Sequence, residues 1–218
     1  MTLEAEAAAD YVQAEAPRLI KVAGATAISF ALYDGANRAL LLGKQQDVHE
    51  HAWQIAAGYR NATSSLTIVQ VTLLLDRDSN VVSFQHIYRC LKRPEVVHIL
   101  VRRACNDSPL AEAIEVDIRA SVRRFLKTYT AIDWDAHGRL QDFRNHGLAH
   151  LTPEGIEKRP SYAEIRSFVH TVTVLGECLT PFDPNGVPLW LDEIDDWSNH
   201  AKLVWDAAFR TFGKLSDS

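Results

Sequence analysis

Asp142–His150 is the segment of this chain whose side chains are best suited to chemistry. It reads Asp-Phe-Arg-Asn-His-Gly-Leu-Ala-His, so a carboxylate, a guanidinium, an amide and two imidazoles lie close together. Arg144 carries a planar fork of donors that matches two phosphate oxygens, and His150 can exchange a proton near neutral pH. Asn145 can orient a phosphate or an imidazole without adding charge. We therefore expect Arg144, His150 and Asn145 to cleave RNA without a metal, because ribose supplies its own 2′-OH nucleophile.

Two other interpretations of the same segment compete with this one. Asp142, His146 and His150 follow one another at intervals of four, so on a straight helix they form one ridge that could help to hold Zn²⁺ or Fe²⁺. The outer two would lie about 12 Å apart along the axis, too far for one ion unless the helix bends at Gly147. Alternatively, Arg144 and His150 only form salt bridges near a helix end, with Asp142 or a carbonyl as partner. We expect no metal and no other cofactor.

The spacing of Arg144 and His150 also predicts an oligomer. On one regular helix the two side chains would diverge by about 120° and about 9 Å, so a single chain presents them poorly to one atom. Two chains related by a two-fold axis would bring two arginines and two histidines around a shared cleft. One histidine could then act as base and the other as acid. The expected assembly is a homodimer with an RNA substrate.

Helical periodicity dominates the rest of the chain, and glycine and proline are scarce. A long helix is predicted from Asp47, with one apolar stripe along its length and a second buried face near its C-terminal end. The stripe comprises Val48, Ala52, Ile55, Tyr59, Ala62, Leu66, Val69 and Leu73, and the second face comprises Ile68, Val71 and Leu75.

Other helices are predicted from the same periodicity and from capping signals. One spans about 17–43, with a possible break at Asp34-Gly35, and one starts near Ala136 and ends by Thr152, because Pro153 disfavours helix in the residue before it. Inward residues of a helix at about 110–131 are Ile114, Ile118, Val122, Phe125 and Tyr129. A Ser161–Glu164 capping box opens a helix that directs inward Ile165, Phe168, Val169, Val172, Leu175 and Leu179. A last helix, capped by Asp192, directs inward Trp197, Ala201, Val204, Ala208 and Phe212.

Basic residues on the 110–131 helix have two interpretations. Arg119, Arg123 and Lys127 form a ridge with intervals of four residues, which is usually a solvated face. The same ridge could bind RNA, together with His146 and Asp142 near the catalytic set.

Length and composition indicate one domain over residues 1–218, and the helical periodicity described above predicts that it is all-α. The chain has 218 residues, 47% of them hydrophobic, and a net charge of −5, which does not favour indiscriminate coating of nucleic acid. Its three cysteines are widely spaced and form no metal-binding pair, as is typical of a reducing cytosol. The uncharged runs at 22–33 and 61–75 are shorter than a membrane span. We expect a cytoplasmic protein with no membrane contact and a C-terminal helix at about 192–213.

Arg144-Asn145-x4-His150 in a helical hairpin resembles the Arg-x4–6-His signature of the HEPN superfamily. It is most similar to the AbiU-type abortive-infection branch, whose motif reads Arg-Asn-Lys-Arg-Ile-Ala-His. The flanks agree, since Leu140-Gln141-Asp142-Phe143 matches the Leu-x-Asp-aromatic that precedes that motif. The helix ending Leu73-Leu74-Leu75-Asp76-Arg77 is also similar to the one that leads into a Leu-x-Asp turn in that branch.

The resemblance covers about residues 25–180 and implies a HEPN-like core there, a helical bundle that dimerises through its motif helices. It further implies a metal-independent endoribonuclease of phage defence or a toxin, with a possible antitoxin or regulatory partner. Arg144 and His150 would be the paired catalytic residues and Asn145 the polar partner beside the arginine. His146 and Gly147 replace basic residues of the family motif, and Thr152 replaces the tyrosine that a nucleotidyltransferase antitoxin modifies. Some HEPN domains bind RNA or act as scaffolds without cutting, so a non-catalytic module is the alternative.

Overall fold

Every secondary-structure element in the described residues is helical, which confirms the all-α prediction. The structure is a computed structural model that describes residues 3–43, 50–78, 80–106, 108–148, 160–183 and 193–215. The α-helices are α1 (Leu3–Gly43), α2 (Glu50–Leu74), α3 (Phe84–Leu91), α4 (Pro94–Cys105), α5 (Ala111–Thr130), α6 (Trp134–Asp142), α7 (Tyr162–Glu177) and α8 (Glu193–Leu215). A π-helix, η1 (Phe143–Leu148), continues α6, and a short 3-10 turn, η2 (Thr180–Phe182), follows α7.

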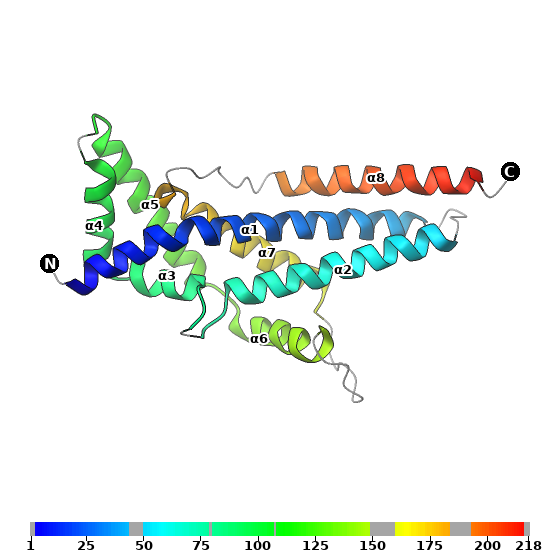
Figure 1. Cartoon of the computed structure of the whole chain (residues 1–218), viewed down its shortest axis with the longest axis horizontal. Helices are drawn as coiled ribbons and strands as arrows, with labels where there is room; N and C mark the ends of the chain where they lie inside the picture. The colour runs from blue at the N-terminus through cyan, green and yellow to red at the C-terminus, as the bar shows by residue number, and fades with distance from the viewer. Residues whose placement is uncertain are drawn as a thin grey trace.

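The helix α1 is the spine of an elongated bundle (Figure 1). Helices α2, α7 and α8 pack along it, while α3, α4 and α5 gather around its N-terminal half. Helix α6 lies on the outer side of α2, and the two chain ends lie at opposite ends of the long axis. This arrangement sets α6 and η1 against α2, at the side of the bundle.

Small residues let the other helices approach α1 closely. Buried alanines recur along it at positions such as Ala9, Ala16, Ala23 and Ala31. Gly35 marks the closest approach, because a Cβ there would lie 2.5 Å from the Ala201 Cβ of α8 and 2.7 Å from two of its backbone atoms. The chain therefore needs glycine at this position to seat α8.

Two predictions about α1 are wrong. The helix begins at Leu3 rather than at Pro17, and Pro17 lies inside it. It also continues through Asp34 and Gly35 without a break. Packing explains the continuity: Asp34 is buried and accepts a hydrogen bond from the Tyr162 hydroxyl at 2.8 Å, while α8 covers Gly35. Tertiary contacts thus outweigh the low helix propensity of this dipeptide.

The apolar stripe predicted to be buried on α2 is instead largely in solvent, so that prediction is wrong. Ile55 is 60% exposed, Leu66 48% and Leu73 44%. The second predicted face is buried, with Ile68, Val71 and Leu75 all at 2% exposure or less. Helix α2 therefore has two apolar faces. The described residues bury the second face and cover the stripe only in part, since Ala52 is buried and the Tyr59 ring lies 5.4 Å from that of Trp205 of α8.

Most of the remaining helices follow their predicted patterns. Helix α5 buries Ile118, Val122, Phe125 and Tyr129, and the Ser161–Glu164 capping box is present at the start of α7. Val204 is 66% exposed, so its predicted inward position on α8 is wrong, and Phe209 is buried there. Asp192, the expected cap of this helix, and Thr152, the expected limit of the motif helix, lie outside the described residues.

Two features were not predicted from the sequence. Helices α3 and α4 are short and amphipathic, and their buried residues join the main core with those of α1 and α5. By length and composition, one described helix (Leu3–Leu42) could cross a membrane, although 67% of its most apolar window is buried in the fold. A helix in the core of the bundle is buried to this extent.

Candidate active site

The motif segment adopts a π-helix rather than the regular α-helix assumed above. From Phe143 to Leu148 the backbone winds with i→i+5 bonding, immediately after α6 ends at Asp142. A π-turn is wider than an α-turn, so successive residues are no longer about 100° apart around the axis. The angle of about 120° between Arg144 and His150 was calculated for a regular α-helix and therefore does not apply. Short π-segments are rare and occur often at functional sites.

Arg144 points from this π-helix towards α2 without meeting a carboxylate among the described residues. Its Nε donates to the Asn145 Oδ1 at 3.0 Å, and its Nη1 donates to the Thr72 hydroxyl of α2 at 3.4 Å. The side chain is half-buried. No ion pair joins it to Asp142, so the salt-bridge interpretation finds no support in that residue. Two of the five guanidinium N–H groups donate in these bonds, and the other three have no acceptor among the described residues.

His146 follows Arg144 by two residues on the same π-helix. Its Nδ1 donates to the Asp142 carbonyl oxygen at 3.1 Å, because a carbonyl can only accept. Both His146 and Asp142 are exposed. This arrangement holds His146 against its own helix and leaves the Asp142 carboxylate in solvent.

A second imidazole, His137 of α6, is buried behind the motif. It is 3% exposed, and its Nε2 has no hydrogen-bond partner among the described residues. Burial lowers the pKa of His137 to about 4, and the positive charges of Arg77 and Arg144 add to the effect while Asp76 opposes it. The ring is therefore neutral at pH 7 and excluded from acid–base chemistry near neutrality. Arg77 itself stacks over Trp134, 3.8 Å from the ring centre.

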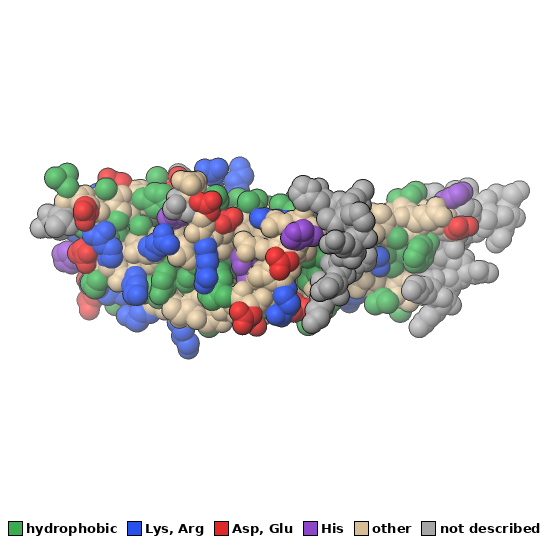
Figure 2. Space-filling view, turned by 90° about the horizontal axis from the view of Figure 1, so that it is seen from below, with side chains coloured by type: hydrophobic (Ala, Val, Ile, Leu, Met, Phe, Trp, Pro, Cys, Tyr) green, Lys and Arg blue, Asp and Glu red, His purple; other side chains and the backbone are tan. Residues whose placement is uncertain are grey.

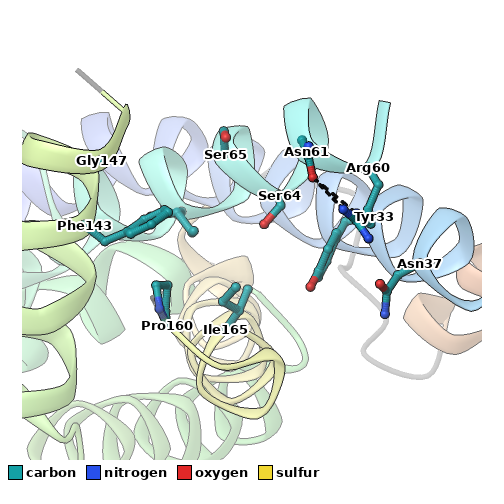
Figure 3. Close-up of a pocket in the computed structure, with 11 residues that line it drawn as sticks. Tyr33, Asn37, Arg60, Asn61, Ser64, Ser65, Phe143, Gly147, Pro160 and Ile165 are labelled. Atoms are coloured by element: carbon teal, nitrogen blue, oxygen red, sulfur yellow. Dashed lines mark hydrogen bonds between the residues drawn. The ribbon is translucent and has the colours of Figure 1, made fainter. Parts of the chain in front are cut away.

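A pocket of about 360 Å³ opens between α1, α2, α7 and η1 (Figure 3). Phe143 and Gly147 of η1 form one end of it, and Arg60 and Asn61 of α2 lie towards the other. The further lining residues are Tyr33, Asn37, Ser64, Ser65, Ile68, Pro160 and Ile165. None of the eleven carries an acidic side chain.

The structure brings together part of the predicted set. Arg144, Asn145, His146 and Asp142 lie in or beside η1, whereas His150 lies outside the described residues. Its position relative to Arg144 therefore stays a prediction. Gly147, three residues before it in the sequence, lines the pocket.

The basic ridge on α5 lies away from this site, on the helix that packs against α3 and α4. Arg119 is neutralised by Glu115 of the same helix at 2.7 Å, while Arg123 and Lys127 are exposed. Figure 2 shows basic side chains gathered towards the end of the molecule built by α3, α4 and α5, with acidic and hydrophobic groups among them. Most of the ridge is therefore solvent-exposed.

Sequence reasoning missed the pocket residues. Arg60 is the only Lys, Arg, Asp or Glu between residues 51 and 75, which is unusual for an exposed helix and was a usable signal. Tyr33 and Asn37 carried no signal, because only the packing of α1 against α2 and α7 brings them to the same cavity.

No group of three His, Cys, Asp or Glu in the described residues could hold a metal ion. The predicted alternative of Asp142, His146 and His150 includes a residue outside that range, so it is not decided by this finding. Comparisons with known protein families, with curated proteins and with solved structures find no match to this chain.

Proposed function

We propose that this protein is a homodimeric, metal-independent endoribonuclease of the phage-defence or toxin type, with a HEPN-like bundle. Arg144 binds the scissile phosphate and stabilises the charge that develops on it. His150 exchanges protons with the 2′-OH and the leaving oxygen, and Asn145 holds the guanidinium in place. The protein acts in the cytoplasm, and a neutralising or regulatory partner controls it. No membrane contact is part of the proposal.

The observation that carries the proposal is a largely exposed apolar stripe on α2 beside Arg144, which meets no carboxylate among the described residues. Ile55, Tyr59, Ala62, Leu66, Val69 and Leu73 follow one another at intervals of 4, 3, 4, 3 and 4 residues. This spacing is that of a coiled-coil seam, and the four largest of these side chains are 36–60% exposed. A stripe of this kind fits a second copy of itself. Arg60 is the only acidic or basic side chain between residues 51 and 75, so no like charges would face each other across most of the seam.

The position of η1 favours one orientation of the two copies. Arg144 contacts Thr72, which lies on one flank of the stripe. A parallel pair of α2 helices would set the two η1 segments on opposite sides of the seam. An antiparallel pair, with its two-fold axis in the seam and perpendicular to the helices, sets both segments on the same side. It also places the positive end of each helix dipole near the negative end of the other. Centred at Ser64, such a pair separates its two Thr72 positions by about 24 Å along the axis, so both motifs open onto the same face of the dimer at different levels.

Cleavage of RNA in EDTA tests the nuclease directly. Purified protein should cut total RNA with EDTA present. His150→Ala should lower the rate by about 10²–10⁴-fold, the usual contribution of a general acid–base group. Arg144→Ala should lower it by about 10²–10³-fold, as the loss of one charge-stabilising donor does. Cleavage by His150→Ala at the wild-type rate would exclude the assigned role.

The dimer has its own test, which does not depend on activity. Leu66→Glu places a carboxylate in the centre of the seam and should yield a folded monomer by light scattering, without RNA cleavage. Leu110→Glu is the matched control, because Leu110 is 66% exposed at the start of α5 and away from the seam. A Leu66→Glu protein that stays dimeric would contradict the seam, and a fully active monomer would contradict the composite site.

Cross-linking distinguishes the two orientations. Ile55→Cys and Leu73→Cys are equidistant from the centre of the stripe, at the position of Ser64. In the antiparallel dimer a mixture of the two variants gives a cross-link between the different chains. Efficient cross-links between identical variants, with none in the mixture, would show the parallel arrangement instead.

A non-catalytic RNA-binding or scaffold module is the second candidate. The exposed basic side chains of α5, with the free donors of Arg144, favour it over a purely structural protein. This candidate predicts salt-sensitive RNA binding without cleavage, lost in Arg144→Ala and kept in His150→Ala. A stoichiometric metal found by elemental analysis would instead support the site of Asp142, His146 and His150.

A further inference from the structure

The pocket beside η1 has a charge pattern that packing alone does not explain. Among the described residues that line it, Arg60 is the only one with a charged side chain, and the neighbouring groups Asn37, Asn61 and Ser64 are polar but neutral. The Arg60 guanidinium is close enough to lower the pKa of Tyr33, which burial otherwise raises. One cation therefore lies at the wall of a half-open cavity without an acid in that wall.

The donors of Arg60 are only partly used. Its Nε and Nη2 both donate to the Asn61 Oδ1, at 3.2 and 3.0 Å, which leaves three of the five N–H groups without a partner among the described residues. Asp34, the acid that also acts on Tyr33, already accepts from the Tyr162 hydroxyl and pairs with Arg38 at 3.7 Å. A half-buried guanidinium without a counter-ion is costly, so the pocket favours an anionic ligand.

The opposite wall of the pocket is apolar and partly aromatic. Phe143 reaches into the cavity from η1, with Pro160 and Ile165 below it (Figure 3). A ligand that satisfies both walls carries an anionic group for Arg60 and a flat, apolar body for Phe143. The volume of about 360 Å³ lies at the lower end of the usual range for ligand sites, about 300–1,000 Å³, so the ligand is small. A single nucleotide has these properties, and aromatic side chains commonly stack unpaired bases.

We propose that this pocket binds one nucleotide of single-stranded RNA, with its phosphate on Arg60 and its base against Phe143. The inference rests on the proposed function and adds a substrate contact away from the scissile linkage. Arg60 and Arg144 are built alike, since the Nε of each donates to the side-chain oxygen of the asparagine that follows it. Thr72, which Arg144 contacts, lies twelve residues after Arg60 on α2, or about 18 Å along the axis. At about 3.4 Å per stacked nucleotide, this distance corresponds to about five nucleotides.

Equilibrium binding to labelled RNA tests the pocket without relying on cleavage. In the His150→Ala protein, Arg60→Gln should weaken binding of a 12-nucleotide single strand at least tenfold, the effect of losing one charge-assisted contact. The slope of log K against log salt should fall by about one phosphate contact. A 3-nucleotide strand bound at Arg144 is too short to reach Arg60, so its affinity should not change. Arg18→Gln is the control, because Arg18 is exposed on α1 and pairs only loosely with Glu15 at 3.8 Å.

Three results would overturn the proposal. Equal binding of the 12-nucleotide strand by the Arg60→Gln and Arg18→Gln proteins shows that Arg60 does not contact RNA. An equal loss for both strand lengths places Arg60 next to the scissile linkage rather than five nucleotides from it. Saturable binding of a free 5′-mononucleotide that requires Arg60, with RNA binding independent of it, assigns the pocket to a free nucleotide.

The outcomes for the pocket and for the nuclease are separable. RNA binding that depends on Arg60 in a wild-type protein that cuts nothing supports the pocket and refutes the nuclease. Cleavage in EDTA by an Arg60→Gln protein that binds RNA as tightly as wild type does the reverse. Thermal unfolding of each variant checks that the substitution leaves the fold intact.

Discussion

Gly35→Ala should destabilise the protein although it replaces glycine by the best helix former. The added Cβ would lie 2.5 Å from the Ala201 Cβ, 2.7 Å from the Lys202 backbone N and 2.7 Å from the Ser198 carbonyl oxygen. Ordinary carbon contacts are about 3.5–4.0 Å, so α1 and α8 must separate by about 1 Å. Two of the three atoms belong to the α8 backbone, which cannot turn aside as a side chain can. Overpacking of this kind costs about 1–3 kcal/mol, and three simultaneous contacts place it near 3.

The gain in helix propensity offsets part of this loss. Alanine is favoured over glycine inside a helix by about 1 kcal/mol, so we expect a net loss of about 2 kcal/mol in the free energy of unfolding. Gly138→Ala on α6 is the matched control, because nothing lies within 4 Å of its Cβ, and it should raise stability by up to about 1 kcal/mol. Urea unfolding at pH 7 measures both, and amide exchange should show the α8 backbone less protected in Gly35→Ala. A Gly35→Ala protein as stable as Gly138→Ala would refute the close approach of α1 and α8.

Two further predictions concern pH. The His137 pKa of about 4 lies below the ordinary 6.5, so the unfolded state binds more protons between these values and stability falls as the pH drops through this window. Between pH 7 and pH 5 the free energy of unfolding of the wild type should fall by about 2 kcal/mol more than that of His137→Phe, as measured by urea unfolding at each pH. If the two stabilities fall in parallel, the pKa of His137 is not lowered in the folded state. Glu164 accepts hydrogen bonds from Arg139 and Ser161, which lower its pKa to about 2. Its contribution to the stability of the fold is therefore fully present above about pH 4.5 and is lost as the pH falls through about 2. Glu164→Ala should cost about 1–2 kcal/mol at neutral pH and roughly 40% of that at pH 3, because a carboxyl with a pKa of about 2 is still mostly ionised there. Glu112→Ala, in the first turn of α5, should cost less at neutral pH, and an equal cost for both would contradict the capping role.

Helix α2 illustrates how far the sequence predicts this fold. Its periodicity correctly predicts a long helix with two apolar faces, because burial of either face requires the same 3.6-residue repeat. Periodicity cannot say which chain covers a face, so the stripe containing Leu66 was assigned to the core of its own chain. The absence of charge around Arg60 was the one local sign that this helix does not simply face water.

The other errors have local causes that spacing does not reveal. Asp34-Gly35 resembles a turn until Tyr162 and α8 are brought against it. The π-helix begins where α6 ends, and the composition of Phe143–Leu148 alone does not distinguish it from an α-helix with a glycine near its end. The pocket draws residues from α1, α2, α7 and η1, so it exists only once these four elements are packed together.

The two proposals place different demands on α2, which is why they can fail separately. The pocket is already formed within a single chain by α1, α2, α7 and η1, so the proposed nucleotide binding at Arg60 does not depend on dimerisation. Cleavage needs a second copy, because the proposed cleft combines motif residues from both sides of the seam. A charge at Leu66 therefore acts on the exposed stripe and leaves the pocket wall, whereas a change at Arg60 acts on the wall and leaves the stripe. The arrangement of α2 thus predicts that assembly controls catalysis and that each chain contacts RNA on its own.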